Sequence, residues 1–230
     1  MNNTEENKLD NPVWNSLSES HAKFAFDYNG TKFYNPDYCP FGGFLDLEST
    51  LESAEKYASL CENFFIVGEK PKIADTLKLK LVKELVCLQM IIHQKIQITF
   101  DNEIIKLTEE HSAELFDLVN LVQPGYFKTK TSLLGNYYGI FNDGKLAAIA
   151  GERMKMNNFT EVSAIITHPD HTGKGYAKQL TSHVVNNIFD EGKIPFLHVV
   201  ESNIGAVKLY EKLGFVTRRK MSFWNISKKI

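Results

Sequence analysis

Residues 162 to 177, VSAIITHPDHTGKGYA, have the pattern of a β-strand that runs through a glycine-spaced turn into a helix. The segment from Val162 to Thr167 is rich in β-branched residues, which favour strands. Gly173 and Gly175 permit backbone conformations that a side chain would forbid. From Tyr176 onward, apolar residues recur at helical spacing, at Ala177, Leu180, Val184, Val185 and Ile188. A strand and a helix joined in this way indicate a mixed α/β fold.

The start of that helix is suited to binding an anion. The first backbone N–H groups of a helix have no partner within the helix, and they carry a partial positive charge. The segment Gly173 to Ala177 therefore offers N–H groups to a pyrophosphate. The spacing differs from two other phosphate-binding motifs. Gly173-Lys174 is followed by Gly175 rather than by Ser or Thr, and Lys178 stands where a dinucleotide fingerprint has its third glycine.

Two motifs together resemble the GCN5-related N-acetyltransferases (GNAT). Thr172, Gly175 and Ala177 stand at the fixed places of that family's acyl-CoA motif, Q/R-x-x-G-x-G/A, although Thr172 departs from the usual Gln or Arg. Further along, residues 195 to 215 resemble the last strand and helix of the family's FR47-like branch. The residues in register there are Asn203, Ala206, Leu209, Tyr210, Leu213, Gly214 and Phe215. The resemblance covers roughly residues 103 to 230.

The resemblance implies an α/β (α+β) fold with a mixed, mostly antiparallel acetyltransferase sheet flanked by helices. Asn142-Asp143-Gly144 predicts the turn of a hairpin. The expected elements are strand 104–107, helix 109–122, a short helix near 127–135, hairpin strands 137–141 and 146–154, strand 160–167, helix 174–190, strand 195–200, helix 203–212 and strand 216–225. This order is the acetyltransferase order.

The first hundred residues contain weaker signals, and we expect a smaller N-terminal α/β region of unknown role at residues 1 to 100. The expected elements are strands 24–27 and 32–34 around an Asn29-Gly30 turn, a loop marked by Pro36, Pro40, Gly42 and Gly43, an acidic helix at 48–59, and strands 64–68 and 77–88. The turn-forming pair Asp101-Asn102 is the expected boundary to an acetyltransferase domain at residues 103 to 230.

Composition limits the compartment and the partners. The chain has 26 Lys and Arg against 28 Asp and Glu, so no global charge attracts nucleic acid or an anionic membrane. The polar, acidic start is no signal peptide, and no apolar run approaches the roughly 18 residues of a membrane span. Cys39, Cys61 and Cys87 form no CxxC pair, which fits a reducing compartment without structural zinc. We expect a cytoplasmic protein with no metal, nucleic acid or membrane partner; composition leaves the oligomeric state open.

The family resemblance implies an acyl-CoA-dependent N-acyltransferase. Acetyl-CoA is the expected donor co-substrate, and a bound amine attacks it directly in a ternary complex. The implied pyrophosphate site is formed by Thr172, Gly173, Lys174, Gly175, Tyr176 and Ala177. Backbone groups of Ile165, Ile166 and Thr167 would bind the pantetheine arm like an added strand. Asn203 would cap its helix, bond a pantetheine amide, or do both.

Tyr210 resembles the tyrosine that gives a proton to the coenzyme A thiolate in many family members. A phenol has a pKa of about 10 and a thiol of about 8.5, so the transfer is uphill by roughly 2 kcal/mol and the role is one of assistance. The alternative is that Tyr210 only packs on the apolar face of its helix.

Glu161 is the expected base. It stands eleven residues before Thr172, where the histone-acetylating branch of the family carries its catalytic glutamate. A base matters because keeping a lysine-type amine neutral at pH 7 costs about 4 to 5 kcal/mol. Glu152 is the reserve candidate, and His168 and His171 in the motif turn are further titratable groups. The alternative for Glu161 is a solvated side chain at the start of a strand.

Two other functions stay open at this point. One is a non-catalytic acyl-CoA-binding or sensor module. The other is transfer to a macromolecule, such as a protein N-terminus, a lysine or an aminoacyl-tRNA, and the near-neutral charge disfavours tRNA. In this family, acceptor specificity resides in loops that have no common sequence motif. The expected acceptor is therefore a small-molecule or peptide amine.

Overall fold

The computed structural model describes residues 3–73 and 78–229. Its centre is one mixed sheet of eleven strands, in the order β1-β2-β3-β4-β11-β5-β10-β9-β8-β7-β6. The strands are β1 Ala25–Tyr28, β2 Thr31–Tyr34, β3 Phe41–Phe44, β4 Asn63–Val67, β5 Leu79–Ile91, β6 Ile105–Lys106, β7 Tyr137–Asn142, β8 Lys145–Lys155, β9 Phe159–Thr167, β10 Ile194–Val200 and β11 Val216–Lys228. Two neighbouring pairs are parallel, β3 with β4 and β9 with β10, and the other pairs are antiparallel. The predicted fold class is confirmed.

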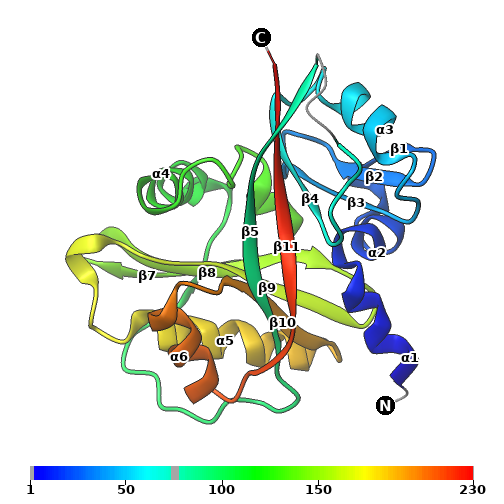
Figure 1. Ribbon diagram of the computed structural model, residues 1–230. Coiled ribbons are helices and arrows are strands. Elements are labelled where there is room, and N and C mark those ends of the chain that lie inside the picture. Colours follow the sequence, from blue (N-terminus) through cyan, green and yellow to red (C-terminus); the bar gives the residue numbers. More distant parts are fainter. Residues whose placement is uncertain (1–2, 74–77, 230) are drawn as a thin grey trace.

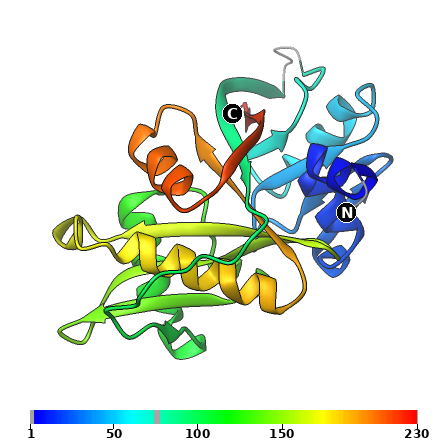
Figure 2. The same cartoon turned by 90° about the horizontal axis from the view of Figure 1, so that it is seen from below.

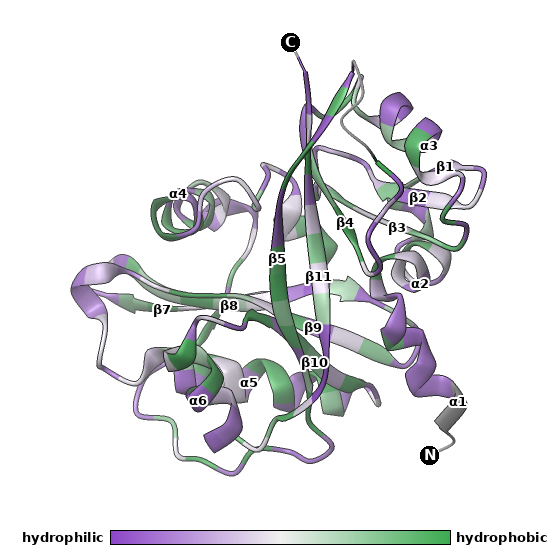
Figure 3. Cartoon of the chain, viewed as in Figure 1, coloured by the Kyte–Doolittle hydropathy of each residue, from purple (hydrophilic) through white to green (hydrophobic). Residues whose placement is uncertain are grey.

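Helices cover the sheet on both faces (Figures 1 and 2). They are α1 Asn3–Glu6, α2 Pro12–Ser18, α3 Thr50–Tyr57, α4 Ser112–Val122, α5 Tyr176–Asp190 and α6 Ile204–Lys212, with short 3₁₀ segments η1 Asn7–Asp10, η2 Ala22–Phe24, η3 Glu109–His111, η4 Thr131–Leu134 and η5 Pro169–His171. Consecutive residues of β7 show the two faces, because Tyr137 packs in the cluster with α4 and Tyr138 in the cluster with α5. The strands β4 and β10 are largely hydrophobic, whereas β11 and the segment around α1 contain many hydrophilic residues (Figure 3). Within the described ranges, every helix is too short or too polar to cross a bilayer.

Both predicted turns are present. Asn29 and Gly30 have φ values of 44° and 92°, and Asp143 and Gly144 have 50° and 74°. Positive φ at two successive residues matches the twist of the flanking strands in a tight hairpin. These turns form where predicted because the Asn-Gly and Asp-Gly pairs tolerate that geometry.

The predicted loop around Gly42 and Gly43 is wrong, because both residues lie in β3. A Cβ on Gly42 would stand 2.4 Å from the ring of Phe33, and one on Gly43 would stand 2.8 Å from the backbone nitrogen of Trp14. Close packing of a ring and of α2 against the strand therefore requires glycine there. The predicted strand at 77–88 is β5, and Leu77 lies outside the described residues.

The strand β5 joins the first hundred residues to the rest of the sheet. It pairs antiparallel with β11 on one side and with β10 on the other (Figure 1). The sheet therefore continues across the sequence position of the expected boundary at Asp101-Asn102, and the division into two domains stays a prediction.

Candidate active site

The parallel strands β9 and β10 separate after a short contact. They pair at Phe159 with Ile194, at Thr160 with Pro195 and at Glu161 with Phe196, and no further. Beyond that point β10 continues along β5, and β9 continues along β8. The edge of β9 that faces β10 is therefore without a strand partner from Val162 onward.

A bulge in β9 accompanies this separation. The register with β8 shifts between the pairs Gly151–Ser163 and Ile149–Ile166, so β9 has one residue more than β8 in that interval. Ala164 lies in the interval with a φ of 49°, a left-handed conformation that is uncommon for a residue other than glycine. Such strain concentrates at functional sites. The bulge bends β9 away from β10.

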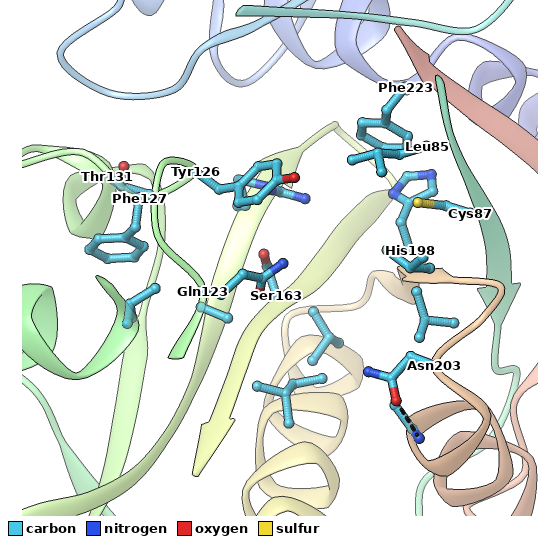
Figure 4. A pocket seen from close by; sticks show the side chains of 18 of the residues that line it. Leu85, Cys87, Gln123, Tyr126, Phe127, Thr131, Ser163, His198, Asn203 and Phe223 are labelled. Carbon is cyan, nitrogen blue, oxygen red and sulfur yellow. Dashed lines mark hydrogen bonds between the residues drawn. The ribbon is translucent and has the colours of Figure 1, made fainter. Parts of the chain in front are cut away.

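A cavity opens between the two diverging strands (Figure 4). It is lined by Phe41, Leu85, Cys87, Val119, Gln123, Tyr126, Phe127, Thr131, Tyr137, Arg153, Val162, Ser163, Ala164, Ile165, His198, Val199, Val200, Asn203, Ala206, Tyr210 and Phe223. Asn203 lies at one end, whereas Leu85, Cys87 and Phe223 lie at the other (Figure 4). Tyr126 and Phe127, from the segment after α4, form a side wall. The cavity therefore has an α6 end and an end built by β3, β5 and β11.

The α6 end contains two residues singled out from the sequence. Asn203 precedes α6, and its Oδ1 accepts a hydrogen bond from the N–H of Ala206 at 3.2 Å (Figure 4). Asn203 thus caps the helix as predicted and also lines the cavity. Tyr210 is buried in the cluster that packs on α5, yet it too lines the cavity. Burial raises the pKa of its hydroxyl well above the ordinary value, so Tyr210 is a weak acid in the empty cavity.

The glycine turn between β9 and α5 has the geometry expected of an anion site. Gly173 and Gly175 have φ values of 79° and 76°, and a Cβ on either would meet no heavy atom within 4 Å. The residues from Thr172 to Gly175 are exposed, Lys174 donates to His171 Nδ1, and α5 begins at the buried Tyr176. The turn lies beyond the end of β9, outside the cavity lining. A ligand that occupies both the cavity and the glycine turn would have to extend along β9.

The strand residues predicted to hold the pantetheine arm lie between cavity and turn. Ile165 lines the cavity, whereas the Ile166 side chain is buried against α4. Thr167 is the last residue of β9 and pairs with Ala148. Their backbone groups therefore lie along the path from the cavity to the glycine turn.

Glu161 lies outside the cavity lining, and both of its carboxylate oxygens accept hydrogen bonds. Arg153 donates from Nε to Oε2 and from Nη2 to Oε1, both at 2.8 Å, and His198 donates from Nδ1 to Oε1 at 2.8 Å. Burial alone would raise the pKa of Glu161, but the Arg153 charge and these hydrogen bonds lower it to about 2. A carboxylate held in this way is a weak base. The proton-accepting role of Glu161 stays a prediction, and the geometry favours a role in orienting Arg153 and His198.

The other titratable candidates lie away from the cavity. Glu152 is fully buried and accepts from Lys155 Nζ at 2.8 Å and from the N–H of Asn136 at 3.0 Å. His168 and His171 flank or belong to η5, and neither lines the cavity. In residues 3–73 and 78–229 no group of three or more His, Cys, Asp or Glu is placed to hold a metal ion.

Sequence reasoning singled out only a few of the residues that line the cavity, and those it missed include Tyr137, Arg153 and His198. His198 interrupts the otherwise apolar strand β10, and an ionisable residue in such a run is a usable signal, whereas Arg153 directly follows Glu152 on β8 and carries no such signal. The nitrogen of His198 that does not face Glu161, Nε2, accepts from the Gln89 amide at 3.2 Å. Both ring nitrogens of His198 are therefore engaged.

The family model for FR47-like proteins matches residues 137–224. By sequence, the chain is similar to the L-amino acid N-acyltransferase MnaT of Escherichia coli, with 36% identity over 59 residues. That match covers 25% of this chain and 34% of MnaT, so it spans about a third of the relative's length.

Solved structures resemble nearly the whole chain. A protein from Novosphingobium aromaticivorans, described as an acetyltransferase of the GNAT family, superimposes with a TM-score of 0.86 and 32% identity, covering 96% of this chain and 99% of its own. A GCN5-related N-acetyltransferase from Kribbella flavida has a TM-score of 0.62 and 14% identity, covering 95% and 93% of the two chains. The second likeness concerns the fold alone.

Proposed function

Because the chain belongs to the GNAT family of acetyltransferases, we propose that it transfers the acetyl group of acetyl-CoA to the nitrogen of an amine. The observation that carries the proposal is the cavity between β9 and β10, which contains Tyr210 at one end and leads along the unpaired edge of β9 to the glycine turn. A donor and an acceptor would enter from different ends and meet between the two strands.

The donor would occupy the β9 side. Backbone N–H groups of Gly173 to Ala177 would bind its pyrophosphate, with Lys174 and Thr172 at the rim. The free edge at Ile165, Ile166 and Thr167 would bind the pantetheine arm as an added strand. Asn203 caps α6 through Oδ1, which leaves its Nδ2 for a carbonyl of the arm. The thioester would then lie beside Val200 and Tyr210.

The acceptor nitrogen would attack the thioester carbonyl carbon, and the C–S bond would break with the electron pair on sulfur. Tyr210 would give its hydroxyl proton to the departing thiolate and regain a proton from solvent. Burial raises the Tyr210 pKa in the empty cavity, so the proton transfer would assist the departing thiolate rather than drive its departure.

The acceptor must lose one proton, and solvent is the proposed recipient. Of the ionisable groups that line the cavity, Arg153 is a cation, His198 is engaged at both nitrogens, and burial raises the pKa of Cys87 to about 12. None is an uncommitted base at neutral pH. Glu161 would contribute by fixing Arg153 and His198.

The three cysteines are buried and free, which supports the proposal of a reducing, cytoplasmic setting.

Free-thiol release from acetyl-CoA tests the proposal across amino acids, polyamines, amino sugars and peptides. We expect release with at least one amine, together with an equal amount of N-acetylated product. Tyr210→Phe keeps the packing body and removes the hydroxyl, so it should lower kcat by roughly 10- to 1000-fold while the KM for acetyl-CoA stays close to that of the wild type. Binding of acetyl-CoA without release for any amine would instead indicate a non-catalytic acyl-CoA-binding module.

A further inference from the structure

The cavity wall lacks the groups that a polycation needs. Among the described residues that line it, there is no Asp, Glu or Lys, and Arg153 is the one charged side chain. Most of the lining is apolar or aromatic, and its Phe and Tyr residues are Phe41, Tyr126, Phe127, Tyr137, Tyr210 and Phe223. A polyamine or an amino sugar would lose hydration on entry without gaining carboxylate partners. The chemistry of the wall favours an acceptor with an apolar body.

Tyr137 presents a buried hydroxyl to this cavity. Its side chain is 3% exposed, and its oxygen is one of the few buried polar side-chain atoms without a hydrogen-bond partner in the described parts of the chain. The ring is fixed by Phe127, with the ring centroids 5.6 Å apart, and by Gly151, where an added Cβ would stand 2.3 Å from it. Leaving such a group unpaired costs about 1–3 kcal/mol. A ligand atom in the cavity would remove that cost.

Arg153 supplies a second donor beside it. The guanidinium uses Nε and Nη2 on Glu161, and Nη1 takes part in no hydrogen bond within residues 3–73 and 78–229. Its central carbon stands 4.6 Å from the centroid of the Phe41 ring, which holds the plane in place. Tyr137 pairs with Gly151 across β7 and β8, and Arg153 lies two residues further along β8 on the same face, so both side chains line this cavity. Burial raises the pKa of the Tyr137 hydroxyl although the Arg153 charge opposes that rise, so Tyr137 stays protonated.

A phenol O–H and a guanidinium N–H that face one cavity both require an acceptor oxygen. A carboxylate is the strongest such partner for them, because hydrogen bonds between a cation and an anion are roughly twice as strong as neutral ones. Glu161 occupies the opposite edge of the guanidinium and fixes its orientation, so the Nη1 edge is left for the ligand.

We propose that the acceptor is a small amine that carries a carboxylate and an apolar body, with its carboxylate bound by Tyr137 and Arg153 and its body against Phe41, Leu85 and Phe223. The inference rests on the transfer reaction proposed above and names the acceptor of the same site. The carboxylate anchors one end of the molecule, so the amine faces the gap between β9 and β10 where the thioester would lie.

The test compares kcat/KM for thiol release with L-phenylalanine, L-phenylalaninamide, 2-phenylethylamine and spermidine. The wild type should prefer L-phenylalanine to 2-phenylethylamine by at least about a hundredfold, because two donors bind the carboxylate, and the amide, which has no negative charge, should fall between them. Tyr137→Phe should reduce the preference by about 10- to 100-fold, the range expected for a hydrogen bond to a charged group. It removes an unpartnered hydroxyl, so its melting temperature should equal or exceed that of the wild type.

Tyr138→Phe is the matched control. Tyr138 is the next residue of β7, but it faces α5, with its ring 4.6 Å from that of His183, and it does not line the cavity. This variant should keep the wild-type preference. A wild-type preference near one, a preference for spermidine, or an unaltered preference in Tyr137→Phe would overturn the inference while the transfer reaction stands. Release with none of the amines tested would instead remove the transfer reaction itself, and the inference with it.

Discussion

At the scale of single residues, the sequence position of Glu161 indicates a carboxylate near the site but not the residues that bind this carboxylate. Its distance from Thr172 identified a carboxylate next to the cavity. Its partners, Arg153 on β8 and His198 on β10, come from other strands, so no local pattern indicates that the carboxylate is enclosed. Three charge-assisted hydrogen bonds make Glu161 a support for the cavity wall.

The pH dependence of stability tests this view of Glu161. Its pKa in the folded chain is about 2, below the ordinary 4.5. A lowered pKa stabilises the fold above the unfolded-state value, and this contribution is lost as the pH falls from about 4.5 to about 2. The shift corresponds to about 3 kcal/mol. Glu161→Gln should therefore lower the free energy of unfolding by about that amount near pH 7, and the difference from the wild type should shrink below pH 4.5.

Urea unfolding across that pH range provides the measurement, with Glu110→Gln as the control. Glu110 is an exposed glutamate in η3, so its variant should follow the wild type at every pH. A Glu161→Gln variant as stable as the wild type near pH 7 would contradict the enclosed ion pair. It would return Glu161 to consideration as the base.

At the scale of elements, the prediction of a strand or helix succeeded where the sequence pattern that indicates it lies within the element itself. The strand, turn and helix of β9 and α5 were predicted to within two residues, because β-branched residues, glycines and helical periodicity all lie in one short stretch. The bulge at Ala164 was not predicted, since alanine has no preference for positive φ and no local pattern marks the point where β9 separates from β10. The strand β3 was missed for a related reason, because its glycines fit side chains distant in sequence.

The turn before α5 can be tested apart from its backbone strain. Gly175→Glu would place a negative charge at the start of α5, where repulsion from a phosphate about 4 Å away amounts to about 4 kcal/mol at an effective dielectric constant of 20. After screening by salt, we expect acetyl-CoA affinity to fall by about 2–4 kcal/mol in calorimetry.

Gly192→Glu is the matched control for that variant. Gly192 follows the other end of α5, has a φ of 73° and, like Gly175, has no heavy atom within 4 Å of an added Cβ. The same strain and charge are thus introduced away from the proposed site. Equal affinity in the two variants would mean that the turn does not bind the pyrophosphate.

At the scale of the whole molecule, one sheet joins the first hundred residues to the family motifs. Since β5 lies between β10 and β11, the N-terminal residues Phe41, Leu85 and Cys87 reach the cavity end opposite α6. We infer that this region closes the acceptor end. The sequence contains no motif for that role, because the pairing of β5 with β10 and β11 joins residues more than a hundred positions apart.

The central claim is that donor and acceptor meet between β9 and β10. A crystal structure of the full chain with acetyl-CoA and L-phenylalanine, or with coenzyme A and the acetylated product, tests it most directly. We expect the pyrophosphate on the N–H groups of Gly173 to Ala177, the sulfur within reach of the Tyr210 hydroxyl, and the acceptor on the side of Phe41 and Phe223. Coenzyme A bound elsewhere, or an acceptor outside the cavity between the two strands, would contradict the claim.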